Sequence, residues 1–188
     1  MLNEVLFDEF FLCLESIQLK KHFEKKVMID YFFIQGTIDV NANYFINKIE
    51  EGLKRDDNMS FKTNVKDQMT SYTYFNDDEE FGKIVSQFIT YVDKNMSLRK
   101  YCLLDSWGVK CNVGGETLEH DHLPSLWSGV LYLNSHKQVL NFPEINQSVK
   151  PEKGSFALFS SFLKHKTSIN ETKEIKYGLS FNFRPINN

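Results

Sequence analysis

The 188-residue sequence contains five histidines, and three of them have spacings that suit a metal site. His120 and His122 are two residues apart, so on a β-strand both imidazoles would point to the same face. His165 follows 43 residues after His122. Two ligands from one strand and a third from another strand can occupy three positions on one side of a metal ion. The pattern therefore predicts an open metal site of the kind that suits non-haem iron.

A His-x-His pair is a weak motif by itself, and two exposed histidines at a strand end are the structural alternative. The remaining histidines, His22 and His136, are expected at the surface. The three cysteines, Cys13, Cys102 and Cys111, show no metal-ligand spacing, and Cys102 and Cys111 are expected to fill core or sheet positions. Gly114-Gly115 reads as a turn, because no strand–loop–helix pattern for phosphate binding surrounds it.

The part of the chain that carries His120, His122 and His165 has the texture of a sheet. From Tyr101 onward, short β-prone segments alternate with turn signals. We expect strands at 101–113, 116–122, 126–134, 138–142, 155–160 and 175–184. This succession favours an antiparallel sandwich or an open barrel such as a jelly roll.

The first 100 residues are expected to support that sheet. Apolar stripes predict helices over 43–55 and 78–95, each with a candidate cap before it. The segment 27–35 looks like a strand, whereas 2–33 as a whole fits helix or strand. We therefore expect one domain over 1–188, with a mixed support in 1–100 and the core in 101–184.

Composition excludes several classes of protein. The 22 Lys and Arg against 25 Asp and Glu give a net charge of −3, which mildly disfavours a nucleic-acid partner. No apolar run approaches a membrane span, and the N-terminus lacks the basic region of a signal peptide. Three cysteines without a disulfide pattern suit a reducing, intracellular and cytoplasmic protein. The 17 phenylalanines favour a packed sheet.

Three blocks of sequence carry a family likeness. Residues 118–133 read LEHDHLPSLWSGVLYL, residues 149–159 read VKPEKGSFALF, and residues 176–183, after His165, read KYGLSFNF. In this order the blocks resemble the iron(II)/2-oxoglutarate-dependent oxygenase superfamily. The likeness is greatest to its small members from phages and bacteria, and next to prolyl 4-hydroxylase catalytic domains.

The resemblance implies a mainly β fold with α support. The core would be a double-stranded β-helix, or jelly roll, with the N-terminal helices packed on one sheet. It also implies that His120 is the first iron ligand and His165 the distal one. The superfamily usually has a carboxylate where His122 stands. Its small members have a histidine there, so the resemblance to them implies a three-histidine site. Asp121 is the alternative ligand, but adjacent strand residues point to opposite faces, so pairing it with His120 needs a bulge.

The resemblance implies 2-oxoglutarate as a cosubstrate, and its distal carboxylate would need a cation as a partner. In this superfamily that cation lies around ten residues past the distal histidine, and Lys176 is 11 residues past His165. The chain reads Lys-Tyr-Gly where the family commonly has Arg-x-Ser, yet a lysine suffices as a point charge. Arg184, which would point to the same face of the strand as Lys176, is the alternative. Further residues that could line the cosubstrate pocket are Tyr132, Ser180 and Asn182.

The resemblance implies a dioxygenase that uses Fe(II), 2-oxoglutarate and O₂. Such an enzyme hydroxylates a substrate and releases succinate and CO₂. The alternatives are a cupin-like dioxygenase that needs no 2-oxoglutarate and a non-catalytic jelly-roll protein. A protein side chain, a nucleobase and a small metabolite all stay open as substrates, and the oligomeric state is open too.

Overall fold

The computed structural model describes residues 30–95 and 100–186. Its described residues from Phe32 onward belong to one unit. Cys13, His22 and almost all of the segment 2–33 lie outside the described residues, so a single domain over 1–188 stays a prediction. Within the described part, no helix combines the length and the apolar character needed to cross a membrane.

The largest element is a six-stranded antiparallel sheet. Its strands, in spatial order, are β1 (Phe33–Thr37), β9 (Ser155–Ser160), β6 (Trp127–Tyr132), β11 (Lys176–Pro185), β4 (Tyr101–Cys111) and β3 (Gln68–Met69). The central strand β11 pairs with β6 on one side and with β4 on the other. Residues from both ends of the described chain therefore meet in one sheet.

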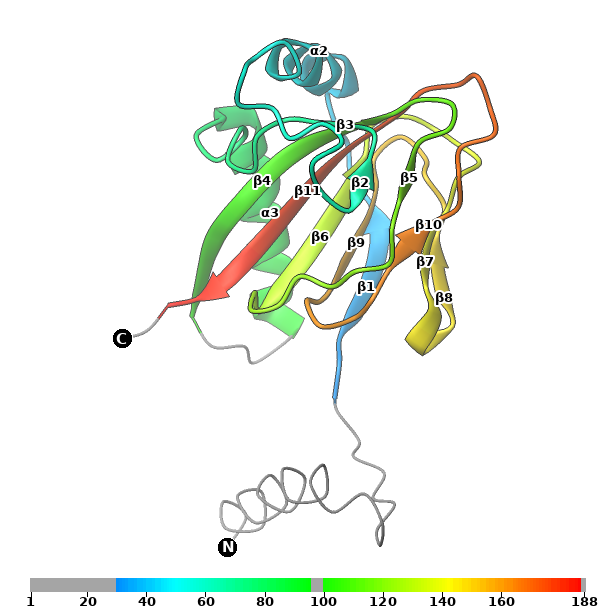
Figure 1. Ribbon diagram of the computed structural model, residues 1–188. Helices are drawn as coiled ribbons and strands as arrows, with labels where there is room; N and C mark the ends of the chain where they lie inside the picture. Colours follow the sequence, from blue (N-terminus) through cyan, green and yellow to red (C-terminus); the bar gives the residue numbers. More distant parts are fainter. Residues whose placement is uncertain (1–29, 96–99, 187–188) are drawn as a thin grey trace, which may run out of the picture. The chain divides into compact units, whose positions relative to one another are not determined.

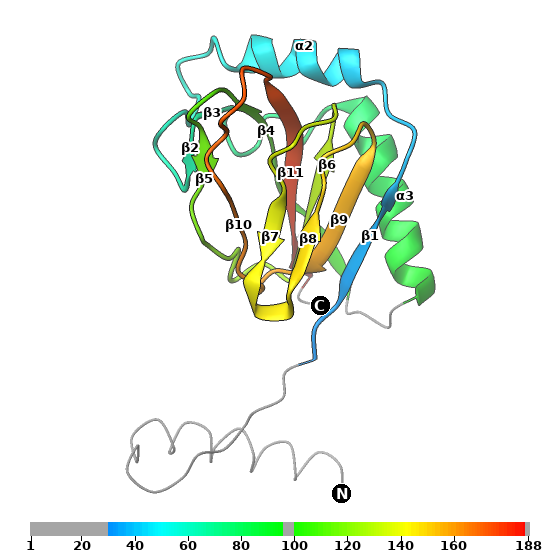
Figure 2. The same ribbon diagram turned by 90° about the vertical axis from the view of Figure 1, so that its right-hand side faces the viewer.

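A second layer faces this sheet (Figures 1 and 2). It consists of a three-stranded sheet, β10 (Lys166–Thr167), β7 (Leu140–Phe142) and β8 (Gln147–Val149), and of the pair β2 (Val65–Lys66) with β5 (Glu116–Thr117). The 3-10 helix η1 (Pro143–Ile145) joins β7 to β8. Thr117 donates its backbone N–H to Thr167 Oγ1 at 2.9 Å, which links β5 to β10.

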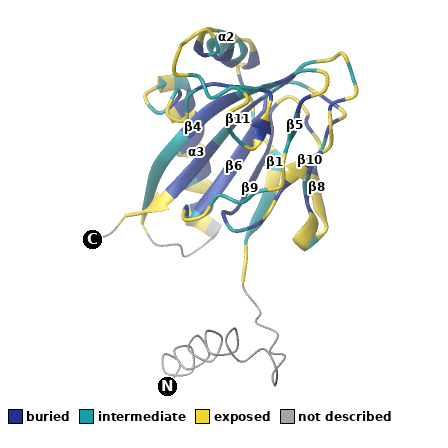
Figure 3. Ribbon diagram, in the orientation of Figure 1, coloured by how far each residue is buried: buried dark blue, intermediate teal, exposed yellow. Residues whose placement is uncertain are grey.

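Two helices cover the opposite face of the large sheet. The first, α2 (Ala42–Gly52), begins after Asn41, whose side chain accepts from Tyr44 N. The second, α3 (Glu79–Asn95), begins after Asp78, whose Oδ1 accepts from Phe81 N at 2.9 Å. Their buried faces form one core with the sheet, which includes Phe45, Ile49, Phe81, Phe88 and Phe181. The central strands are buried on both faces (Figure 3).

Alternation along β11 assigns its side chains to the two faces. Leu179, Phe181 and Phe183 belong to the core under the helices. The alternate residues Lys176 and Ser180 line a hollow between the two sheets instead. The same strand therefore supplies the packing of one layer and the polar groups of the other.

The jelly roll with helices on one sheet is confirmed, and the strand at 155–160 has the predicted bounds. The strand at 116–122 is wrong in length, because regular pairing covers only Glu116–Thr117. The two- and three-residue strands β2, β3, β8 and β10 were not predicted, since such short segments carry no periodicity. His136 is also buried rather than at the surface, with Nδ1 accepting from Gln138 N at 3.0 Å.

The close approach of β4 to α2 yields a stability test. An added Cβ at Gly108 would overlap the side chain of Ile49, which is fully buried. We expect Gly108→Ala to lower the free energy of unfolding by about 1–3 kcal/mol in urea denaturation. Gly82→Ala is the matched control, because a Cβ there meets nothing within 4 Å. It lies in α3, so we expect it to raise stability by about 0.5–1 kcal/mol. Equal effects of the two variants would contradict this packing.

Candidate metal centre

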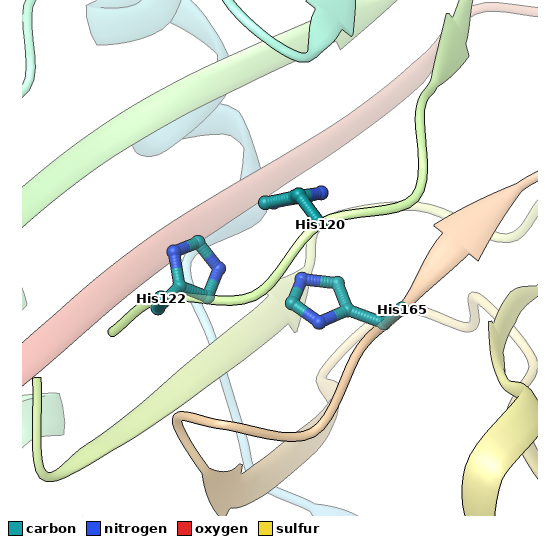
Figure 4. A group of neighbouring side chains, drawn as sticks. All are labelled: His120, His122 and His165. Carbon is teal, nitrogen blue, oxygen red and sulfur yellow. The ribbon is translucent and has the colours of Figure 1, made fainter. Parts of the chain in front are cut away.

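The structure brings His120, His122 and His165 into one group (Figure 4). One ring nitrogen from each lies within 4.8 Å of those of the other two. The ring centroid of His120 is 4.9 Å from that of His122 and 4.4 Å from that of His165. The three side chains point toward a common space, so two segments 45 residues apart in the sequence meet here.

Backbone hydrogen bonds hold the two segments together. His120 N donates to His165 O at 3.2 Å, and His165 N donates to His120 O at 2.9 Å. His122 N donates to Ser161 O at 2.8 Å, which continues the antiparallel contact in an irregular way. His120 and His122 therefore lie beyond the regular strand, but their rings still lie on one side of the chain.

Two of the three rings are oriented by backbone carbonyls. His120 Nδ1 lies 2.8 Å from Leu118 O, and His165 Nδ1 lies 3.0 Å from Leu163 O. A carbonyl oxygen only accepts, so each Nδ1 carries the proton and each Nε2 offers a lone pair. This is the usual way in which proteins fix the tautomer of a histidine that binds a metal.

Burial keeps the three rings neutral. Loss of hydration and, to a smaller extent, charge on His120 together lower the pKa of His165 to about 4. Burial also lowers the pKa of His120. The pKa of His122 lies well below its usual range because of burial first, and then because of charge on the neighbouring His165 and His120. A cation can therefore bind near neutral pH without first displacing protons from the rings.

Asp121 lies outside this histidine group. Its Oδ1 accepts a hydrogen bond from Leu123 N at 3.1 Å, which closes a local turn. No carboxylate belongs to the group of possible ligands among the described residues. The geometry therefore brings together the set with His122 and not the set with Asp121.

A hollow of about 600 Å³, counting its mouth, lies beside the histidines between the two sheets; we call it the inner hollow. Its lining is mostly apolar, with the three histidines and a few hydroxyl groups. The lining residues are Val65, Trp107, Val109, Thr117, His120, His122, Gly129, Val130, Tyr132, Leu140, Phe159, His165, Thr167, Lys176, Gly178 and Ser180. No described carboxylate is among them.

Lys176 is the one lysine of that lining, and its side chain is 7% exposed. Its Nζ lies 6.0 Å from the ring centroid of Tyr132, which is also buried. No carboxylate within residues 30–95 and 100–186 forms an ion pair with it. Burial lowers its pKa to about 8, and the neighbouring Cys111 and Asp67 oppose that shift. An anion in the inner hollow would restore the lost stabilisation of the ammonium group.

The other expected cosubstrate residues divide into two sets. Tyr132 and Ser180 line the inner hollow beside Lys176. Asn182 is buried but accepts from Ser128 Oγ at 2.7 Å and does not line the hollow. Arg184 is exposed and pairs with Cys102, roughly 26 Å along β11 from Lys176. Lys176 and Arg184 therefore share one face of β11, but only Lys176 reaches the hollow.

Aromatic side chains from both sheets pack around the histidines, and the sequence did not assign the two phenylalanines among them to the site. Trp107 of β4 lines the hollow, with its ring centroid 5.9 Å from that of His122. Phe142 and Phe159 pack their rings 5.3 and 4.9 Å from the ring of His165. Trp107 pairs with Ser180 across β4 and β11, which turns both side chains toward the hollow. For Phe142, the three-residue strand β7 is too short to show a periodicity in the sequence.

The donor set fits a divalent transition metal ion. Three neutral imidazoles, two of them with Nε2 free and Nδ1 bonded to the backbone, suit Fe, Ni or Zn. The protein ligands cover one side only, so exogenous ligands would take the remaining positions from the inner hollow. The histidine group is thus able to hold a metal and to leave it accessible.

Comparison with known proteins identifies the fold. No protein-family model matches the chain, and no curated protein matches it. Among solved structures, it is similar to the viral collagen prolyl hydroxylase of Paramecium bursaria Chlorella virus-1 in complex with 2OG, with a TM-score of 0.65 and 17% identity. That match covers 83% of this chain and 96% of the other.

Two further solved structures give the same result. A Pseudomonas putida prolyl-4-hydroxylase aligns with a TM-score of 0.61 and 16% identity over 82% of this chain and 93% of its own. HygX from Streptomyces hygroscopicus, with nickel and 2-oxoglutarate bound, aligns with a TM-score of 0.58 and 11% identity, covering 82% and 81%. The chain therefore has the double-stranded β-helix fold that these structures share.

The two candidate ligand sets differ in their response to substitution. We expect His120→Ala, His122→Ala and His165→Ala each to weaken Ni²⁺ binding by about 100-fold or more in calorimetric titration, because each removes a ligand. Asp121→Asn should bind Ni²⁺ as the unmodified protein does. Loss of binding in Asp121→Asn, with binding intact in His122→Ala, would assign the position to Asp121.

Proposed function

We propose that this protein is an iron(II)/2-oxoglutarate-dependent dioxygenase that hydroxylates a substrate and releases succinate and CO₂. One observation carries the proposal: a single hollow connects a group of three neutral histidines with a buried lysine that forms no ion pair with any described carboxylate. Metal and 2-oxoglutarate together supply the activation of O₂, which side chains do not provide. The chain's own residues would bind, orient and shield these groups.

His120, His122 and His165 would hold the metal. The carbonyls of Leu118 and Leu163 keep two of the rings in place, so the positions of their Nε2 atoms do not depend on the metal. Such preorganisation reduces the cost of assembling the site. Lys176 would bind the distal carboxylate of 2-oxoglutarate, with Tyr132 and Ser180 on the same wall of the hollow.

Charge supports a dianion as the occupant of the inner hollow. Three neutral imidazoles leave both charges of a divalent cation without compensation from the protein, and Lys176 adds a further positive charge. The lining contains no described carboxylate that would repel an anion. In a buried site such unscreened charges interact strongly. A dicarboxylate with one end at the metal and the other at Lys176 would place a negative charge beside each of these positive charges.

The apolar lining would exclude water from the reacting groups. Phe142 and Phe159 pack against His165, and Leu140 and Val130 close the same side of the hollow. Displacement of water strengthens electrostatic contacts and protects reactive groups from side reactions. The known structures with 2-oxoglutarate bound, including the viral prolyl hydroxylase and HygX, support the same occupant.

The reaction itself can be tested directly. We expect the protein to bind Fe(II) and 2-oxoglutarate without O₂ and to develop a weak visible absorption band. On admission of O₂ it should form succinate, even slowly without a substrate. Binding of Fe(II) without 2-oxoglutarate, combined with O₂ uptake, would favour the cupin-like dioxygenase. Metal binding without any turnover would favour the non-catalytic alternative.

Lys176 and Arg184 provide a matched pair of variants. Lys176→Met removes the charge but keeps the length of the side chain, so we expect 2-oxoglutarate to bind about 10- to 100-fold more weakly. Arg184→Met should leave this affinity unchanged, since Arg184 is exposed and lies outside the hollow. Calorimetry on the Ni²⁺-loaded protein measures both values. An effect confined to Arg184→Met would transfer the role to Arg184.

The lowered pKa of Lys176 predicts a pH dependence of 2-oxoglutarate binding. The ammonium group is charged below pH about 8 and loses its proton above it in the free protein. The dissociation constant should therefore be flat from pH 6.5 to 7.5 and should rise above pH 8, because binding then requires uptake of a proton. In Lys176→Met this rise should disappear. A dissociation constant that stays flat up to pH 9 in the unmodified protein would contradict the assignment.

A further inference from the structure

A second hollow lies on the other side of His120 and His122 and has a different chemical character. It measures about 390 Å³ with its mouth, and we call it the outer hollow. Four residues line both hollows, so the two hollows adjoin at the histidine group: Val65, Trp107, His120 and His122. The remaining lining comes from Thr63, Asn64, Met69, Tyr72 and Asp121.

The charge of the outer hollow is opposite to that of the inner one. Asp121 lines it, and no lysine or arginine of the described chain does. Asp105 precedes Trp107 by two residues on β4, so it lies on the same face of the strand. Burial raises the pKa of Tyr72, and the charge of Asp105 raises it further. Neither aspartate forms an ion pair with any residue of 30–95 or 100–186.

Aromatic rings stand beside these carboxylates. The rings of Tyr72 and Trp107 make an edge-to-face pair with centroids 5.4 Å apart, and Tyr72 is 40% exposed. Leu123, two residues after Asp121, is 63% exposed. Aromatic faces next to a carboxylate attract organic cations, which gain cation–π contact, an ion pair and apolar contact with their carbon chain together.

Asp121 is free to bind a ligand through one oxygen. Its Oδ1 accepts from Leu123 N, which holds the carboxylate in place, and no described residue bonds to Oδ2. In the neighbouring inner hollow the charged residue is Lys176 instead. The histidine group thus separates a side suited to an anion from a side suited to a cation.

We propose that the outer hollow holds the substrate and that this substrate carries an organic cation, either a protonated amine or a guanidinium. The inference rests on the proposed function, which assigns the inner hollow to 2-oxoglutarate. Asp121 would pair with the cation, and Tyr72 and Trp107 would contact its carbon chain. The cation would thereby place a neighbouring C–H bond toward the metal. It could belong to a free amine or to a lysine or arginine of a polypeptide.

Intrinsic fluorescence offers a readout that does not depend on turnover. The chain has two tryptophans, of which Trp107 lines the hollow and Trp127 is fully buried against Phe183. Protein loaded with Ni²⁺ and 2-oxoglutarate is titrated with four probes. Two are N-acetyl-lysine methylamide and its Nε-acetylated form, and two are a peptide with a single lysine and its acetylated form. We expect saturable quenching by the cations and at least about tenfold weaker binding of the acetylated probes.

Substitutions locate the site. Asp121→Asn keeps the acceptor for Leu123 N but removes the charge, so cation binding should weaken about tenfold while the acetylated probes are unaffected. Tyr72→Leu should weaken cation binding as well. Asp39→Asn is the matched control, since Asp39 is exposed on the segment between β1 and α2 and lines neither hollow. It should bind every probe unchanged.

The outcomes separate this inference from the proposed function. Normal binding of Ni²⁺ and 2-oxoglutarate with equal affinity for charged and acetylated probes overturns the inference alone, as does an unchanged affinity in Asp121→Asn. Selective cation binding in a protein that neither binds 2-oxoglutarate nor forms succinate overturns the proposed function instead. A preference for the peptide over N-acetyl-lysine methylamide would identify a polypeptide substrate, and the reverse a free amine.

Discussion

The reciprocal pair of backbone hydrogen bonds between His120 and His165 is the contact on which the rest of the centre depends. It joins the segment after β5 to the segment before β10 and so closes the second layer over the large sheet. Each of the two residues then contributes its ring to the same space, with Nδ1 held by a nearby carbonyl. The same pair of hydrogen bonds therefore closes the second layer over the large sheet and brings the histidines together.

Closure also determines the electrostatics. Once the layers are packed, the histidines and Lys176 lose hydration, which lowers the pKa of each. For the histidines this favours the neutral form that binds metal. For Lys176 it leaves a destabilised ammonium group that an anion would stabilise. The large core under α2 and α3 offsets the cost of burying these polar groups.

The two faces of the large sheet have different roles, since one packs against the helices and the other lines the inner hollow. Phenylalanine side chains fill the helix side, where Phe88 stacks on Phe181 with ring centroids 5.5 Å apart. The other face carries the polar and small residues that leave room for a hollow, such as Gly178 and Ser180. Because β-strand side chains alternate, each central strand serves both needs, and packing on one side holds the polar groups on the other in place.

Local patterns in the sequence determined which residues share a face. The spacing of His120 and His122, the parity of Lys176 with Ser180, and the apolar stripes of the two helices all follow from the geometry of a few neighbouring residues. Tertiary structure alone decided which of these residues meet. Arg184 has the same parity as Lys176 yet lies at the far end of β11, and His136 is buried in a polar network rather than exposed. Side-chain direction is local, whereas position along a strand, burial and loss of hydration depend on segments that are distant in the sequence.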